Sequence, residues 1–140
     1  MRLEISKQTD LAIRAMEALC GNDSTLMSGT LLAAAMSTST HRVPQVMKPL
    51  LRKDWVVSVP GPHGGYRLAV GLAEISLLEV IEAVEGAIDE ERCVLRGAPC
   101  PSPEPCALHV PWSRARQALL SELGNTPVTE VNCRARNGGG

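Results

Sequence analysis

Apolar side chains recur with helical spacing near the start of the chain. Leu11, Ala15 and Leu19 are four residues apart, and Gly21 follows them closely. Such spacing gives a helix one apolar face, and glycine is a common residue just beyond the end of a helix. The pattern predicts a first helix over residues 8–20.

Two further helices are predicted on either side of a polar turn. Ser28 can cap a short helix with the sequence TLLAAAM, and the run STST at 37–40 is typical of a turn followed by the cap of a third helix. The third helix contains Pro44 and Pro49, and proline lacks the N–H donor that a helix interior needs. We therefore expect this helix to start late and to be kinked or broken. A short helix, a tight turn and a basic helix in this order indicate a helix-turn-helix.

A β-hairpin is predicted after the third helix. The runs WVVSV at 55–59 and YRLAV at 66–70 favour strands, and the segment PGPHGG between them is rich in turn residues. Three helices followed by a glycine-rich hairpin are typical of a winged helix. In that arrangement the third helix enters the major groove of DNA and the hairpin lies along the backbone.

Two more helices are predicted beyond the hairpin. Ser76 and Glu79 have the spacing of a capping box at the start of a helix that ends at Gly86. From 107 to 123 an amphipathic helix presents apolar residues every three or four positions. These residues are Leu108, Trp112, Ala115, Leu119 and Leu123. Because the winged helix is already complete, little core is left for this stripe to cover, and we expect it to form a homodimer interface.

The predicted fold is therefore mainly α with a β-hairpin wing. We expect a winged helix-turn-helix over residues 1–72, a loop and a long dimerisation helix over 73–131, and a mobile tail over 132–140. The chain has 140 residues, of which 44% are hydrophobic and 21% charged, and it contains no Phe, which predicts one small domain with an aliphatic core. Neither a membrane span nor a signal peptide is evident, so we expect a cytoplasmic protein with reduced thiols.

A net charge close to zero conceals one basic segment. The formal net charge is −1, yet residues 37–68 contain five Lys or Arg side chains against Asp54 alone, a local charge of +4. This segment spans the predicted third helix and hairpin, so we expect it to bind double-stranded DNA. The candidate DNA-contacting residues are Arg2, Thr40, His41, Arg42, Gln45, Lys48, Arg52, His63 and Arg67.

The segment between the last two helices carries a cluster of potential metal ligands. Cys93, Cys100 and Cys106 lie on a stretch rich in Pro and Gly, and His109 follows three positions after the last of them. Three thiolates and an imidazole can hold zinc or an iron-sulfur cluster, and the wide spacing favours the larger group. The same cysteines could instead be redox-active thiols or ordinary buried side chains. Cys20, on the first helix, is expected to be a core residue.

Several segments together resemble one known family. They are the opening MRL, the helix run QTDLAIRAM, the wing GPHGGYRLA, the run ISLLEVIEAVEG, the triple-cysteine loop and the following CALHVPW. Over residues 1 to about 131 the chain resembles the bacterial winged-helix iron-sulfur transcription regulators of the IscR and NsrR type. The resemblance implies a homodimeric DNA-binding protein whose cluster lies near the dimer interface and controls operator binding. It also implies that Cys93, Cys100 and Cys106 are cluster ligands.

The resemblance leaves two candidates for the fourth ligand. His109 matches the His ligand of the IscR branch and implies a [2Fe-2S] cluster, whereas Asp10 in TDLAIR matches the Asp ligand of the NsrR branch and implies a [4Fe-4S] cluster. His109 is favoured because it is close to Cys106 in the sequence, about one helical turn away.

Two classes of function are consistent with these features. The first is a transcription regulator, expected to be a repressor, whose operator binding responds to nitric oxide, iron or cluster supply, or redox state. The second is a zinc- or cluster-binding interaction or carrier module without a DNA function. No motif pairs a nucleophile with a base, so an enzyme is not expected.

Overall fold

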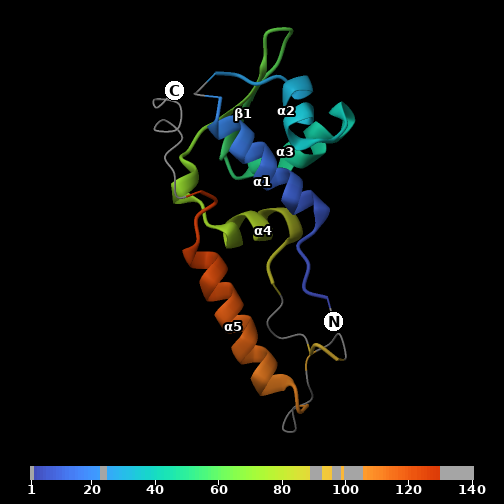
Figure 1. Ribbon diagram of the computed structural model, residues 1–140, viewed down its shortest axis with the longest axis vertical. Coiled ribbons are helices and arrows are strands. Elements are labelled where there is room, and N and C mark those ends of the chain that lie inside the picture. Colours follow the sequence, from blue (N-terminus) through green and yellow to red (C-terminus); the bar gives the residue numbers. More distant parts are fainter. Residues whose placement is uncertain (1, 23–24, 89–92, 96–98, 100–105, 130–140) are drawn as a thin grey trace.

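The computed structural model describes residues 2–22, 25–88, 93–95, 99 and 106–129 (Figure 1). Their elements are α1 (Lys7–Cys20), α2 (Gly29–Met36), the 3-10 turn η1 (Thr40–Arg42), α3 (Val43–Arg52), β1 (Val56–Val59), β2 (Gly65–Leu68), the 3-10 turn η2 (Leu72–Glu74), α4 (Leu77–Glu85) and α5 (His109–Asn125). The mainly α-helical fold with a hairpin wing and a long C-terminal helix is confirmed. The tail predicted for 132–140 lies outside the described residues.

Helix α1 is the centre of the packing. Leu11, Ala15, Met16 and Leu19 on its apolar face are buried, and α1 contacts α2, α3, α4 and β2. The same core takes buried side chains from those elements and from their connections, namely Leu32, Met36, Val43, Val46, Met47, Leu50, Val56, Leu72 and Val80. Methionine has a flexible side chain that fills irregular gaps, and three methionines lie in this core without any Phe. The expected aliphatic core is confirmed.

The third helix starts late, as predicted, but it is not broken. Thr40–Arg42 form the 3-10 turn η1, and α3 begins only at Val43, so that Pro44 lies in the first turn where no helical donor is needed. Pro49 lies inside α3, and the helix nevertheless continues to Arg52. The carbonyl that Pro49 leaves without its helical donor is that of Gln45, and it accepts a hydrogen bond of 3.1 Å from Gln8 Nε2 on α1. A partner from another helix therefore helps α3 to tolerate the proline.

The hairpin is antiparallel and is tied to the helical core by a third segment. Its register pairs Val56 with Leu68 and Val59 with Gly65. Met27, just before α2, forms a bridge with Tyr66 through N–H···O bonds of 2.8 and 2.9 Å. Where this bridge approaches Gly65, a Cβ atom on that glycine would lie 2.4 Å from the Met27 carbonyl oxygen. Only glycine fits there without a shift of the backbone.

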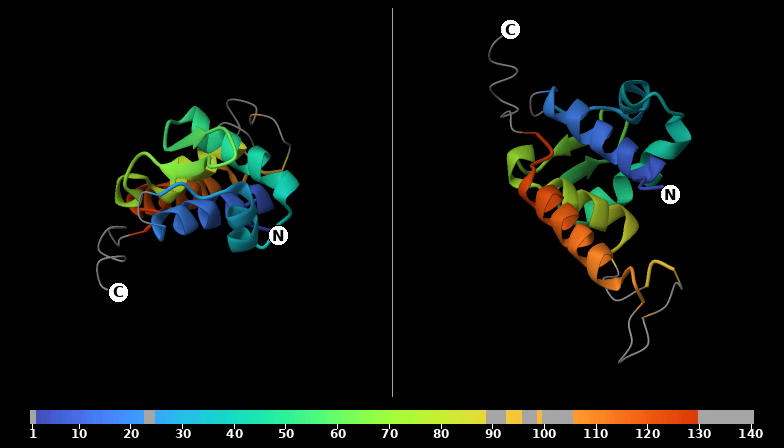
Figure 2. Two further views of the ribbon diagram at one scale, coloured as in Figure 1. Left: turned by 90° about the horizontal axis from the view of Figure 1, so that it is seen from above. Right: turned by 60° about the horizontal axis from the view of Figure 1, so that its bottom comes forward.

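Helix α4 has the predicted capping box and supports α5. Ser76 Oγ accepts from Glu79 N, and the Glu79 carboxylate accepts from Ser76 N. After α5, the chain returns to this point, where the N–H of Leu77 donates to the carbonyl of Thr126 and the N–H of Val128 donates to that of Ile75, both at 2.8 Å. The start of α5 lies at the end of the molecule opposite the hairpin, and the helix runs back along α4 (Figures 1 and 2). Within the described residues no helix is long and apolar enough to cross a membrane.

We predict that Gly65→Ala lowers the free energy of unfolding by at least about 2 kcal/mol, because Gly65 has φ +152° and its site is closed by backbone atoms. Urea denaturation followed by circular dichroism measures the change. Gly71→Ala is the matched control, since that glycine has nothing within 4 Å of an added Cβ and a negative φ. Equal stability of the two variants would contradict the role assigned to Gly65.

Candidate nucleic-acid interface and cysteine site

The turn between α2 and α3 has the geometry of a helix-turn-helix. Ser28 caps α2 by accepting from Leu31 N at 3.2 Å. Ser37 ends this helix in the left-handed conformation with φ 56°, which turns the chain sharply. Because the chain is redirected at that residue, η1 and α3 follow at once.

Helix α3 has one buried face and one exposed polar face. Val43, Val46, Met47, Pro49 and Leu50 are buried against the core. The predicted DNA-contacting residues of this segment are all exposed, and they are Thr40, His41, Arg42, Gln45, Lys48 and Arg52. Because the apolar side chains occupy the other face, the basic and amide side chains project to solvent together. His41 and Arg42, which were expected on the helix itself, belong with Thr40 to the 3-10 turn that precedes α3.

The hairpin adds further exposed polar groups next to this helix. Its strand β1 contacts α3, and Arg67 on β2 and His63 in the turn are exposed. Gly61 in the turn has φ +104°, a backbone conformation that residues with a side chain rarely adopt. Arg2 lies apart, on the segment before α1, and its guanidinium is 4.0 Å from the Glu4 carboxylate.

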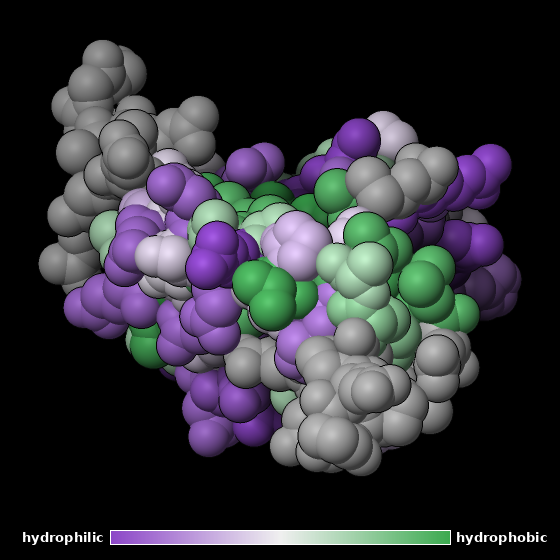
Figure 3. Space-filling model, turned by 90° about the horizontal axis from the view of Figure 1, so that it is seen from below, coloured by the Kyte–Doolittle hydropathy of each residue, from purple (hydrophilic) through white to green (hydrophobic). Residues whose placement is uncertain are grey.

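The stripe predicted on the long helix is not buried within the described part of this chain. Helix α5 has no buried residue; Leu108 is 39% exposed and Leu119 is 46% exposed, while Trp112 and Leu123 are partly buried. Its later half touches α4, where Leu78 lies 3.5 Å from the Cβ position of Gly124. Seen from below, apolar side chains are exposed among the polar ones (Figure 3). Helix α5 therefore offers an apolar surface that the described residues of its own chain leave exposed.

Two of the predicted cluster ligands are brought together. The Sγ atoms of Cys93 and Cys106 are 3.6 Å apart although the residues are thirteen positions apart in the sequence. Both cysteines are free of disulfides; Cys93 is buried and Cys106 is partly exposed. Two sulfur ligands of one tetrahedral metal ion lie about 3.8 Å apart when each metal–sulfur bond is about 2.3 Å. The pair therefore suits a shared metal atom, and it exceeds the disulfide bond length of about 2.05 Å.

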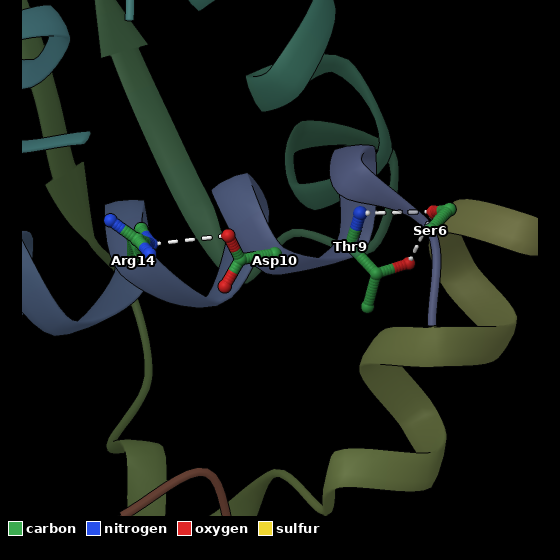
Figure 4. A network of polar contacts seen from close by, with 4 residues as sticks. All are labelled: Ser6, Thr9, Asp10 and Arg14. Carbon is green, nitrogen blue, oxygen red and sulfur yellow. Dashed lines mark hydrogen bonds and ion pairs between the residues drawn. The ribbon is translucent and has the colours of Figure 1, made fainter. Parts of the chain in front are cut away.

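The candidate fourth ligands lie at different positions relative to this pair. His109 is the first residue of α5, is exposed, and donates its backbone N–H to the Cys106 carbonyl at 3.0 Å. Asp10 on α1 is half exposed, and its carboxylate pairs with the Arg14 guanidinium at 3.1 Å (Figure 4). Among the described residues, no group of three or more His, Cys, Asp or Glu side chains is placed to hold a metal ion. Cys100 and Cys133 lie outside those residues.

The remaining described cysteine belongs to the core. Cys20 is 1% exposed and lies in the main cluster of buried side chains, as predicted. It is disulfide-bonded in the structure, contrary to the expectation of reduced thiols throughout.

The sequence alone did not reveal the contacts at the start of α1. Gln8 donates to the carbonyl of Gln45. Ser6 caps the helix by accepting from the N–H of Thr9, and the Thr9 hydroxyl and the Ser6 N–H both donate to the Glu85 carboxylate at the end of α4 (Figure 4 shows the Ser6–Thr9 part). These partners are 37 to 79 residues apart in the sequence. The one local signal was Pro49, which left a carbonyl in need of a donor.

A helix-turn-helix with a basic exposed face and an adjoining hairpin defines a winged-helix DNA-binding protein. Residues 5–133 match the family model Rrf2, described as an iron-dependent transcriptional regulator, and the chain belongs to this family. It is a transcription regulator that binds DNA and is not an enzyme.

Similar proteins agree with this assignment. The HTH-type transcriptional regulator IscR of Cronobacter sakazakii is 33% identical over 87 residues, which are 62% of this chain and 53% of that protein. The structure of CymR, the global cysteine regulator of B. subtilis, superposes with a TM-score of 0.73 at 25% identity, covering 91% of this chain and 94% of that one. IscR of T. potens has the same fold, with a TM-score of 0.66 at 20% identity over 90% of this chain and 83% of that one.

Proposed function

We propose that this regulator is a homodimer whose operator binding is controlled by an iron-sulfur cluster held by Cys93, Cys100, Cys106 and His109. The observation that carries the proposal is the approach of the Cys93 and Cys106 thiols to 3.6 Å from positions thirteen residues apart. The family description as an iron-dependent regulator and the likeness to IscR support it. In this proposal residues 1–72 bind DNA, and residues 73–131 bind the cluster and the second subunit.

The DNA contacts are assigned to the exposed side chains of η1, α3 and the hairpin. Thr40, His41 and Gln45 are placed to contact base edges, because the start of a recognition helix faces the major groove. Positively charged side chains neutralise phosphates and position the protein on the duplex. The residues assigned to that role are Arg42, Lys48, Arg52 and Arg67, with His63 at the turn of the wing and Arg2 on the N-terminal segment.

The dimer is assigned to the exposed apolar stripe of α5. Its members are Leu108, Trp112, Ala115, Leu119 and Leu123, none of which is buried within the chain. A twofold axis lets the same stripe on two subunits cover itself, which removes apolar surface from water in both. Because His109 also begins α5, the cluster site lies beside this proposed interface.

The short distance between the thiols favours a [2Fe-2S] cluster. In a [2Fe-2S] cluster each iron takes two protein ligands, whereas in a [4Fe-4S] cluster each iron takes one. Cys93 and Cys106, whose sulfur atoms are 3.6 Å apart, would hold one iron of such a cluster, and Cys100 and His109 would complete the ligand set. Asp10 is the alternative fourth ligand and would require that its ion pair with Arg14 be given up.

Control of DNA binding requires that the protein with the cluster and the protein without it differ in their affinity for the operator. When bound, an iron-sulfur cluster supplies a group that reacts with oxidants and nitric oxide. The chain itself provides the connection, since the cysteine loop starts just after α4 and ends at α5, where the dimer surface begins. A change at the cysteine site thereby alters how two recognition helices are held at the half-site spacing.

A second candidate is a thiol regulator without iron. The thiols of Cys93 and Cys106 are near enough for a two-electron oxidant to join them in a disulfide after a small movement, and the fold resembles that of the B. subtilis global cysteine regulator. Iron and zinc analysis of anaerobically purified protein separates the two candidates, because only the first requires iron and sulfide.

Changing any one of Cys93, Cys100 or Cys106 to Ala is expected to abolish or severely weaken the visible absorption of the anaerobically purified protein. Cys20→Ala is the control and should keep the spectrum, because Cys20 lies in the core of the winged helix. Wild type should contain about two iron and two sulfide per subunit. A full spectrum in one of the three loop variants would contradict the assigned site.

For the fourth ligand, His109→Ala and Asp10→Ala should be reconstituted side by side. We expect His109→Ala to alter the absorption and Mössbauer spectra and Asp10→Ala to leave them unchanged. The reverse result, with about four iron per subunit, would establish Asp10 and a [4Fe-4S] cluster instead.

The double variant Arg42→Ala, Arg67→Ala is expected to weaken DNA binding and to make it less dependent on salt. The slope of log affinity against log salt should become shallower by about 1.8, which corresponds to two lost phosphate contacts. Fluorescence anisotropy with a duplex of random sequence measures this slope. Arg114→Gln removes one charge from α5 and should leave the slope unchanged, and an unaltered slope in the double variant would argue against these contacts.

Leu119→Glu should dissociate the dimer, because it would place a charge in the apolar stripe without a partner. We expect the variant to sediment as a monomer and to bind an operator at least about tenfold more weakly, since the two half-sites are then bound independently. Sedimentation velocity gives the association state. A variant that remains dimeric would show that α5 does not form the interface.

A further inference from the structure

The interior proline of the recognition helix creates a specific need for a hydrogen-bond donor. Pro49 has no N–H, so the Gln45 carbonyl four residues earlier lacks the partner that every interior carbonyl of an α-helix normally has. Gln45 is also one of the exposed polar residues on the DNA-facing side of α3. The unsatisfied carbonyl therefore belongs to a residue whose position matters for DNA recognition.

The donor that meets this need comes from α1. Gln8 Nε2 lies 3.1 Å from the Gln45 carbonyl oxygen. Helices α1 and α3 also contact each other, and both contribute buried apolar side chains, such as Met16 and Met47, to the common core. Apolar packing is not directional, whereas a hydrogen bond from a side-chain amide fixes both a distance and an angle. Gln8 is thus suited to set the rotation of α3 about its axis.

The first turn of α1, which carries Gln8, is itself held in place by hydrogen bonds. Thr9, the next residue, is fully buried, and its hydroxyl donates to the Glu85 carboxylate. Ser6 caps the same turn by accepting from the N–H of Thr9 (Figure 4), and it donates its own backbone N–H to the same carboxylate at 3.3 Å. The first turn of α1 is therefore attached to the last residue of α4, so the Gln8 amide starts from a defined position.

We propose that Gln8 is a positioning residue for DNA recognition. Its side-chain amide replaces the helical donor that Pro49 lacks and holds α3 in the orientation in which its exposed side chains read DNA. The role goes beyond iron control and rests only on DNA binding through α3. It predicts that loss of the Gln8 amide lowers the preference of the protein for one DNA sequence over another. Salt-dependent binding to DNA of any sequence should not change.

The test uses the full-length protein and a duplex that the wild type selects from random-sequence DNA. Gln8→Met keeps the length and helix preference of the side chain but has no donor. It should weaken binding to the selected duplex about three- to tenfold, the factor that corresponds to one hydrogen bond. Binding to a shuffled duplex and the salt dependence should stay within about twofold. Gln117→Met, an exposed glutamine on α5, is the matched control.

Pro49→Ala provides a second, independent arm. It restores an N–H to α3, so the Gln45 carbonyl regains a helical donor and Gln8 is no longer needed. In the Pro49→Ala background, Gln8→Met should change affinity for the selected duplex by less than about twofold. Thermal unfolding of each variant checks that all of them are folded at the temperature of the binding measurement.

Two results would overturn the proposal. One is an equal loss of affinity for the selected and the shuffled duplex in Gln8→Met, which would indicate a merely structural role. The other is a loss in the Pro49→Ala background as large as in the wild-type background. A protein that selects no sequence at all would overturn both this role and the assignment of α3 to base recognition, whereas an unaffected Gln8→Met overturns the Gln8 role alone.

Discussion

The buried face of α1 is the contact on which the rest of the structure depends. Elements from three other parts of the chain, α2 with α3, β2 and α4, pack on this one helix, and its side chains Ala12, Ala15 and Met16 are completely buried. Small alanine side chains let neighbouring helices approach closely, and methionine fills what space remains. With no Phe in the chain, this close aliphatic packing takes the place of aromatic side chains in the core.

This central position also explains how two distant surfaces are kept in a fixed relation. The hairpin lies at one end of the molecule and the start of α5 at the other (Figure 1). The first turn of α1 is hydrogen-bonded to α3 through Gln8 and to the end of α4 through Thr9. Any rearrangement that moves the end of α4 therefore acts on a turn that also contacts the recognition helix. Such a shared element is what coupling between two binding sites requires.

The cysteine site illustrates a different principle, that two thiols thirteen residues apart in the sequence can meet between two helices. Cys93 is buried although its neighbours Val94 and Leu95 are exposed. Burial of one thiol and partial exposure of its partner Cys106 leave the pair sheltered and still reachable by small reactants.

The sequence by itself determined the order and nature of the elements, because caps, glycines and apolar spacing act within a few residues. The C-terminal end of α1, the Ser28 cap and the capping box at Ser76 were all evident locally. The spacing of the cysteines predicted a metal site, and that site stays a prediction. The basic segment pointed to DNA because charge can be counted without knowing the fold.

Only the tertiary structure decided the contacts between segments far apart in the chain. Pro49 predicted a kink or a break in the third helix, but a donor from α1 satisfies the Gln45 carbonyl and the helix continues to Arg52. Which thiols approach one another also depends on how remote parts of the chain pack. A local pattern carries no information about partners that are 13 to 79 residues away. Those partners are selected by burial of the common core, which is a property of the whole chain.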